Sequence, residues 1–148
     1  MAFTAPKQFT SIDAALESLF GEDKKIVQSD RVFGGDINDA YGFTLTNGAR
    51  IFMKSNTIKN AAFFQAEALG LQAITQTGCI GTPCILGSGT QAGTNGYAFL
   101  LLEWIDGKPP VKEYWELFAG QLAKICTLRF RYASFDLLYI TILAERSK

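Results

Sequence analysis

The chain has 148 residues, 48% of them hydrophobic, with fourteen basic and fourteen acidic side chains, no histidine and three cysteines. This composition suits one domain with a core of ordinary size, whereas the balanced charge argues against nucleic acid or an anionic membrane surface as a partner, and no apolar run approaches the ~20 residues of a membrane span. The lack of histidine removes the commonest general base. The odd number of cysteines and the lack of a recognisable signal peptide indicate a cytoplasmic protein. Cys79 and Cys84 are too few donors to form a zinc site.

A short amphipathic helix is predicted near the N-terminus. It begins around Thr10, which forms a capping-box-like pair with Asp13, and it ends at Gly21. Its buried stripe, at helical spacing, consists of Ile12, Leu16, Leu19 and Phe20. A helix in this place says nothing about chemistry by itself.

A β-hairpin is predicted next. Tyr41, Phe43 and Leu45 alternate with small or polar residues, which is typical of a strand with one buried face. Asn47-Gly48 is the dipeptide that a two-residue type I′ turn prefers, because both central residues need a positive φ. A loop of those two residues pairs Leu45 with Arg50, Phe43 with Phe52 and Tyr41 with Lys54. The hairpin then places Lys54 on its aromatic side, at the end nearest a glycine loop.

That glycine loop and Lys54 suggest a phosphate site. The loop residues are Gly34, Gly35, Asp36, Ile37 and Asn38. An ammonium group beside a loop of backbone amides is one way in which proteins hold a polyphosphate. Asp36 would repel phosphates, so its side chain either caps the amides of the loop or points away. The alternative for Lys54 is an ordinary surface lysine at the end of a strand.

A helix over residues 61–74 strengthens the case for this site. Asn60 is its predicted N-cap, and Glu67 projects into the middle of an apolar arc formed by Phe63, Phe64, Leu71 and Ile74. A buried carboxylate without a partner is costly, so Glu67 needs a cation, and Lys54 on the preceding strand is the one expected. The alternative is that Glu67 reaches solvent at the edge of the helix.

Two further strands are predicted after this helix. Residues 84–86 form a short strand, and the glycines of 87–89 mark the end of a hairpin rather than a phosphate loop, because no helix begins there. Residues 97–102 are continuously apolar, which indicates a strand covered on both faces. A final helix is predicted over 112–125, with a core face of Tyr114, Leu117, Phe118, Leu122 and Ile125.

Six motifs in this order resemble the fructosamine kinases, also called ketosamine 3-kinases, of the aminoglycoside phosphotransferase group. The resemblance runs from about residue 15 to residue 125 and is carried by residues 34–41, 52–56, 64–71, 83–89, 101–105 and 114–123. It implies an α+β, protein-kinase-like N-terminal lobe, an antiparallel sheet with an αC-type helix, followed by a helical extension. It also implies ATP and Mg as cofactors, and phosphoryl transfer to the 3-hydroxyl of protein-bound ketosamines.

The resemblance assigns the nucleotide site residue by residue. Gly34, Gly35, Asp36, Ile37 and Asn38 would form the phosphate loop, and Lys54 with Glu67 the phosphate-positioning pair. Glu103, Trp104 and Ile105 would form the hinge, whose backbone reads the edge of the adenine. The alternative for these three residues is a plain connection to the next helix, with Trp104 packed in the core.

The resemblance ends near Ile125. Family members continue to a second lobe that carries a catalytic loop and a metal-binding aspartate, and residues 126–148 match neither. The expectation is therefore a kinase-like unit over 1–125 followed by an atypical apolar tail of out-of-frame or replacement sequence. On this expectation the catalytic lobe is missing, and the chain contains no catalytic or metal residue. The tail could form a strand or a surface for self-association.

Three functions follow from these observations. The first is a ketosamine kinase by descent, here truncated and catalytically incompetent. The second is a kinase-like lobe that binds a nucleotide or a partner without catalysis. The third is a degraded product that is poorly soluble because its lower face stays uncovered.

Overall fold

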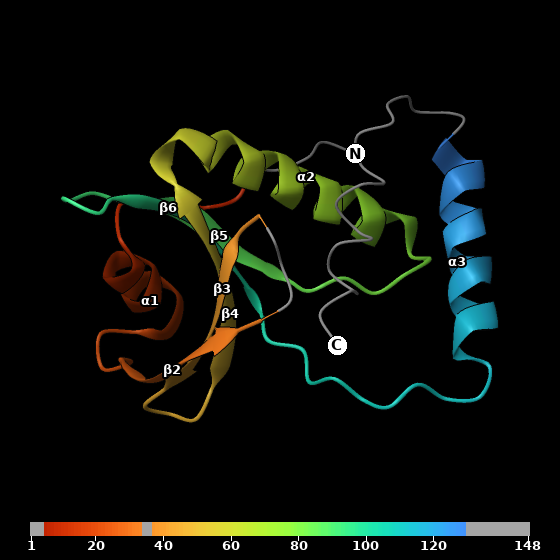
Figure 1. Cartoon of the computed structure of the whole chain (residues 1–148), viewed down its shortest axis with the longest axis horizontal. Coiled ribbons are helices and arrows are strands. Elements are labelled where there is room, and N and C mark those ends of the chain that lie inside the picture. The colour runs from red at the N-terminus through yellow and green to blue at the C-terminus, as the bar shows by residue number, and fades with distance from the viewer. Residues whose placement is uncertain (1–4, 34–36, 130–148) are drawn as a thin grey trace.

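The protein is an α+β domain, described here by a computed structural model over residues 5–33 and 37–129. Six strands form one sheet in the order β1-β5-β6-β4-β3-β2, helices α1 and α2 pack against it, and α3 lies beyond the end of α2 (Figure 1). In chain order the elements are β1 (Gln8–Phe9), α1 (Ile12–Phe20), β2 (Ile26–Val32), β3 (Asp39–Leu45), β4 (Arg50–Thr57), the 3₁₀ turn η1 (Ile58–Asn60), α2 (Ala61–Thr77), β5 (Ile85–Gln91), β6 (Tyr97–Glu103) and α3 (Tyr114–Arg129). The predicted α+β class is confirmed. The predicted tail lies largely outside the described residues.

The sheet has a hydrophobic cluster on each face. Helix α1 contributes Ala15 and Leu16 to one cluster, and α2 contributes Phe64, Ala68 and Leu71 to the other. Strand β6 supplies both clusters: Phe99 and Leu101 face α1, whereas Ala98, Leu100 and Leu102 face α2. Successive side chains of a strand point to opposite faces, so a strand between two helices must be apolar throughout. The expectation for residues 97–102 is confirmed.

The N-cap of helix α1 lies one residue later than predicted. Ser11 is the N-cap, and its Oγ accepts a hydrogen bond from the backbone N–H of Ala14 at 3.0 Å. The predicted capping role of Thr10 is therefore wrong, because the extended backbone of Ser11 already places a hydroxyl at the first turn. Gly21 ends the helix at φ 95°, as expected.

The β3–β4 hairpin contains a three-residue loop, and its predicted register is wrong by one residue. The N–H of Leu45 donates to the carbonyl of Ala49 at 2.8 Å, and Gly48 alone of the loop residues has a positive φ, at 81°. This is the signature of a type I turn closed by a left-handed residue rather than a type I′ turn. The observed pairs are Thr44 with Arg50, Phe43 with Ile51, Gly42 with Phe52, Tyr41 with Met53 and Ala40 with Lys54.

Helix α2 buries three of the four residues of the predicted apolar arc, namely Phe64, Leu71 and Ile74. Phe64 is 2% exposed, whereas Phe63 is 67% exposed, so the inclusion of Phe63 in the buried arc is wrong. Neighbouring side chains in a helix are about 100° apart, and in α2 it is Phe64 that packs in the cluster against the sheet. Asn60 occupies the predicted N-cap position but makes no capping hydrogen bond.

The sequence predicted that the glycines of residues 87–89 end a hairpin. This prediction is wrong, because these residues lie inside β5. A Cβ built on Gly89 would lie 2.1 Å from the carbonyl oxygen of Phe9. Glycine is therefore needed here so that β1 can pair in parallel with β5, where Gln8 lies opposite Ser88 and Phe9 opposite Gly89.

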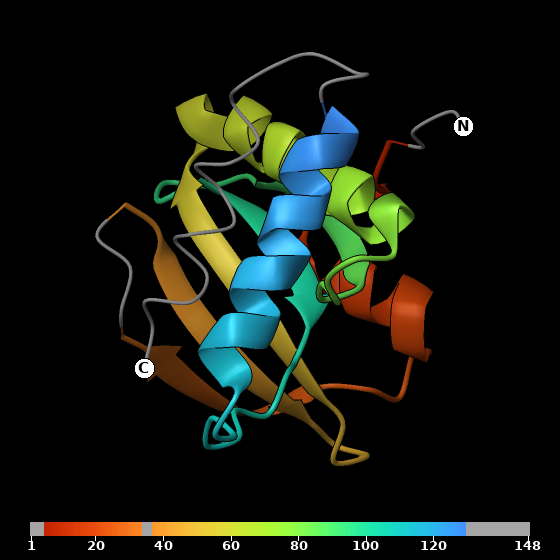
Figure 2. The ribbon, with the colours of Figure 1, turned by 90° about the vertical axis from the view of Figure 1, so that its right-hand side faces the viewer.

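Helix α3 begins at Tyr114, after an extended segment, and lies beside the C-terminal end of α2 (Figure 2). Of its predicted core face, Ile125 is buried, but Leu117 is 60% exposed, so that assignment is wrong for Leu117. The spacing of apolar residues identifies the apolar face of a helix, but it does not indicate whether another helix or strand packs against that face. No helix in the described parts of the chain is long and apolar enough to cross a membrane.

Candidate functional site

Lys54 and Glu67 form an ion pair between the sheet and helix α2. The Nζ of Lys54 lies 2.6 Å from Oε1 of Glu67, and the two side chains are 18% and 12% exposed. Both alternatives from the sequence, a surface lysine and a glutamate that reaches solvent, are therefore wrong. The pairing itself is as expected.

The face of the sheet that carries this pair differs from the predicted one. In the observed register Lys54 lies opposite Ala40, on the face shared with Gly42 and Phe52 and covered by α2. The aromatic side of β3, with Tyr41 and Phe43, faces α1 instead. A shift of one residue moves a side chain to the other face of a sheet, so the two-residue loop would have separated Lys54 from Glu67.

The predicted phosphate loop is described only in part. Gly34, Gly35 and Asp36 lie outside the described residues, and their assignment stays a prediction. Ile37 is 67% exposed, and its carbonyl accepts a hydrogen bond from Nδ2 of Asn56 at 3.0 Å. The same Nδ2 donates to Oδ1 of Asn38 at 2.7 Å. The segment that follows the glycines is thus attached to β4, two residues beyond Lys54.

The predicted hinge leaves the end of β6. The N–H of Glu103 donates to the carbonyl of Cys84 at 2.9 Å, and the N–H of Cys84 donates to Oε2 of Glu103 at 3.0 Å. The backbone hydrogen bond from Cys84, together with its thiol, holds the pKa of Glu103 below its usual value. In turn, the hydrogen bond and negative charge of Glu103 raise the pKa of the Cys84 thiol.

This contact predicts how Cys84 responds to alkylation. Replacing Glu103 with glutamine removes the carboxylate that stabilises the protonated thiol, so the pKa of Cys84 should fall and its thiolate fraction at pH 8 should rise. Peptide-resolved mass spectrometry after iodoacetamide should show faster modification of Cys84 in Glu103→Gln. Cys126, which is also exposed, is the internal control. Equal rates at Cys84 in both proteins would contradict the assigned contact.

Trp104 lies against the sheet in a small polar and aromatic cluster. The guanidinium carbon of Arg50 is 3.7 Å from the centroid of its ring, and its Nε1 donates to Oδ1 of Asp106 at 2.8 Å. Arg50 and Asp106 also form an ion pair at 3.5 Å. Phe52 flanks the indole at 6.3 Å between centroids. The side chain of Trp104 therefore packs on the face that carries Lys54, and its predicted role in the hinge stays a prediction.

Gly42 leaves room for that indole. A Cβ at this position would lie 2.7 Å from Cζ3 of Trp104, and Arg50 and Asp106 oppose an outward movement of the ring. Gly42→Ala should therefore lower the free energy of unfolding by about 1–2 kcal/mol and shift the tryptophan emission. Chemical denaturation followed by fluorescence measures both effects.

Gly120 provides the matched control for this prediction. It lies in α3 with no atom within 4 Å of a built Cβ, so Gly120→Ala should stabilise the helix by roughly 0.5–1 kcal/mol. Similar changes in stability for both variants would show that Trp104 does not limit the space at Gly42.

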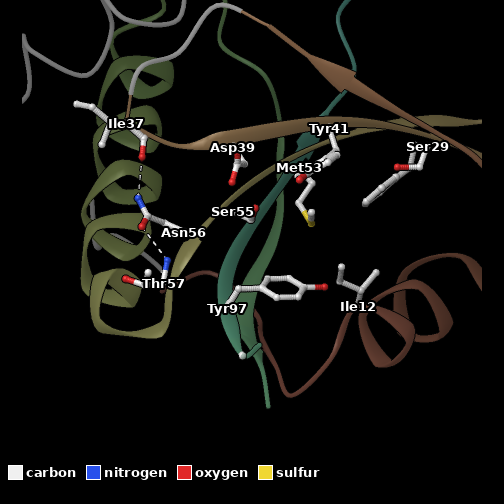
Figure 3. A pocket seen from close by; sticks show the side chains of 12 residues that line it. Ile12, Ser29, Ile37, Asp39, Tyr41, Met53, Ser55, Asn56, Thr57 and Tyr97 are labelled. Carbon is white, nitrogen blue, oxygen red and sulfur yellow. Dashed lines mark hydrogen bonds between the residues drawn. The ribbon is translucent and has the colours of Figure 1, made fainter. Parts of the chain in front are cut away.

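A hollow of about 510 Å³ lies on the opposite, α1 face of the sheet (Figure 3). Asp39, Tyr41, Met53 and Ser55 project toward it from β3 and β4, and Tyr97 and Ile12 close its other side. Helix α1 has nine residues, about 14 Å, and is shorter than the strands it covers. Burial, with Asp13 and Tyr41 nearby, raises the pKa of Tyr97.

The sequence analysis missed several residues around the site. Asn56 appeared only within a matched motif, Arg50 appeared only as the predicted partner of Leu45, and no role was predicted for Gly42 or Asp106. A strand glycine opposite an aromatic residue is a known sign of close approach, which could have drawn attention to Gly42. The contact between Arg50 and Asp106 joins residues 56 apart in sequence, and no local pattern indicates it.

A metal site is not found among residues 5–33 and 37–129. No three histidine, cysteine, aspartate or glutamate side chains in these ranges are placed to hold an ion.

Comparisons with a family model and with known relatives point to the same family. The sequence model of the family "Fructosamine kinase" matches residues 8–136. Two designated ketoamine kinases, from Synechocystis sp. and Vibrio cholerae, are each 30% identical, over 126 and 95 residues. Those alignments include 84% and 64% of this chain, and the chain spans 41% and 31% of the length of these relatives.

Two crystal structures share the fold. One is of a Haemophilus somnus protein designated fructosamine-3-kinase, with a TM-score of 0.66 and 26% identity over 77% of this chain and 37% of that one. The other, from Thermobifida fusca, has a TM-score of 0.53 and 24% identity over 79% of this chain and 38% of that one, and supports the fold alone. The predicted kinase-like architecture is thereby confirmed.

Proposed function

The chain belongs to the fructosamine kinase family, and on that basis we propose that residues 34–105 hold ATP for phosphoryl transfer to the 3-hydroxyl of protein-bound ketosamines. In this proposal Lys54 contacts the phosphates and Glu67 orients it. Gly34, Gly35, Asp36, Ile37 and Asn38 contribute the loop, and Glu103, Trp104 and Ile105 the hinge. The 2.6 Å ion pair between Lys54 and Glu67 is the observation that carries it.

The placement of the pair supports a binding role. A lysine needed only for solubility would extend from the strand into water, whereas the side chain of Lys54 is 18% exposed and held in one direction by Glu67. A fixed ammonium loses less conformational entropy when it contacts an anion. Phosphoryl transfer depends mainly on such positioning of the phosphates and on electrostatic stabilisation.

A second function, nucleotide binding without transfer, is favoured by one observation. Transfer needs a metal that neutralises the phosphates and an oriented acceptor as well as the nucleotide, whereas the Lys54–Glu67 pair acts on the nucleotide alone. An assay for phosphorylated product with a glycated amine and Mg-ATP separates transfer from binding alone.

Thermal unfolding with and without Mg-ATP tests the proposed binding. A ligand that binds only the native state stabilises it by about 2.7 kcal/mol when present at 100 times its Kd, so the melting temperature of the wild type should rise. Lys54→Ala should melt at a temperature that Mg-ATP does not change. Lys59→Ala, an exposed lysine on η1, should keep the rise. A cooperative melt of the wild type that nucleotide leaves unmoved would refute the proposal.

A further inference from the structure

The side-chain amide of Asn56 uses all of its hydrogen-bonding groups. Its Nδ2 donates to the carbonyl of Ile37 at 3.0 Å and to Oδ1 of Asn38 at 2.7 Å. Its Oδ1 accepts from the N–H of Thr57 at 2.7 Å and from Nδ2 of Asn60 at 2.9 Å. Figure 3 shows the bonds to Ile37 and Thr57 at one end of the hollow. A primary amide has two donors and one two-lone-pair acceptor, so this amide is fully satisfied.

Three of these bonds join separate parts of the site, and the fourth, from Thr57, stays within β4. Ile37 and Asn38 lead from the glycine segment into β3. Asn56 lies on β4, two residues after Lys54. Asn60 directly precedes α2, the helix that carries Glu67. One side chain therefore connects the end of the glycine segment, the strand of the lysine and the helix of the glutamate.

We propose that Asn56 is a positioning residue that holds these three elements in one arrangement. The two functions of its amide are separate: the nitrogen holds Ile37 and Asn38, and the oxygen holds Asn60 at the start of α2. Loss of the nitrogen should loosen residues 37–41 without loosening α2. Where this inference concerns nucleotide affinity, it rests on the proposed function.

Substitutions can separate the two functions. Asn56→Asp is close to isosteric and keeps an acceptor for Thr57 and Asn60, but it loses both donors and places a carboxylate beside the carbonyl of Ile37. Asn60→Ala removes only the contact at the α2 side. Asn47→Asp is the matched control: it adds the same charge in the β3–β4 turn and keeps the acceptor that Asn47 offers to the N–H of Ala49.

Hydrogen–deuterium exchange of the full chain, read by mass spectrometry, tests this separation. In Asn56→Asp, exchange of segment 37–41 should rise by about fivefold or more, as expected for losing one or two hydrogen bonds, while segment 57–64 stays near wild type. Asn60→Ala should show the reverse, and Asn47→Asp should change neither segment. Unchanged exchange of segment 37–41 in Asn56→Asp would overturn the inference.

Nucleotide affinity gives a second readout on the same proteins. The apparent Kd for Mg-ATP should rise at least about fivefold in Asn56→Asp and stay near wild type in Asn47→Asp. If the exchange pattern appears but the wild type does not bind Mg-ATP, the positioning role stands and the proposed function fails. If the wild type binds and Asn56→Asp binds equally well, Asn56 does not position the site.

Discussion

Replacing Phe64 with alanine is expected to lower the free energy of unfolding by about 3–5 kcal/mol, the usual cost of deleting a buried phenylalanine. Phe64 is 2% exposed and packs with Ala68 and Leu71 of α2 against β6. The loss should loosen the whole helix, because this cluster is its main contact with the sheet. Urea unfolding followed by circular dichroism measures the change.

Phe63 is the control for this prediction. It precedes Phe64 in the same helical turn and is 67% exposed, so Phe63→Ala should change stability by less than about 0.5 kcal/mol. Both variants make the same chemical change in the same helix, so their difference isolates tertiary burial from helix propensity. Equal losses would mean that α2 is rotated about its axis relative to the described structure.

Lys54→Met should lower the free energy of unfolding by about 2–3 kcal/mol. It removes the cation from Glu67, whose side chain is 12% exposed and is then left without its charge partner. This loss of stability is smaller than that expected for a fully buried pair, because the side chain of Lys54 is 18% exposed and water can reach the carboxylate. Urea unfolding at pH 7 measures it.

The double variant Lys54→Met/Glu67→Leu should recover most of that stability, because an apolar pair avoids the desolvation of both charges. The coupling free energy from the double-mutant cycle should therefore approach the sum of the losses in the two single variants. A double variant as unstable as the sum of the single variants would show that the two side chains do not interact. Nucleotide binding should be lost in both Lys54 variants, so stability and function separate in the double variant.

Much of the fold could be predicted from local patterns. Alternating side chains identified β3, the uninterrupted apolar run identified β6 as a strand covered on both faces, and helical spacing identified α1 and α2. The Lys54–Glu67 pair was also predictable, since a carboxylate inside an apolar helix face must find a cation. Each of these conclusions depends on the residue pattern within one helix or strand, or on one helix and a single buried charge.

The errors occurred where a backbone detail or a distant segment decides the outcome. Asn47-Gly48 is compatible with loops of two or three residues, and only the observed φ of Gly48 and the bond between Leu45 and Ala49 distinguish them. The loop length in turn decides which face Lys54 occupies. Similarly, the rotation of α2 against the sheet decides between Phe63 and Phe64.

The sequence alone therefore determined the order and type of the main elements, the family resemblance and the need for a cation at Glu67, because periodicity and the cost of burying charge act through local composition. The tertiary structure decided the hairpin register, the face that carries Lys54, the packing of Trp104 on Gly42 and the fourfold bonding of Asn56. Each of these depends on how separate segments meet, and a shift of one residue in a strand or about 100° in a helix changes which side chains make contact.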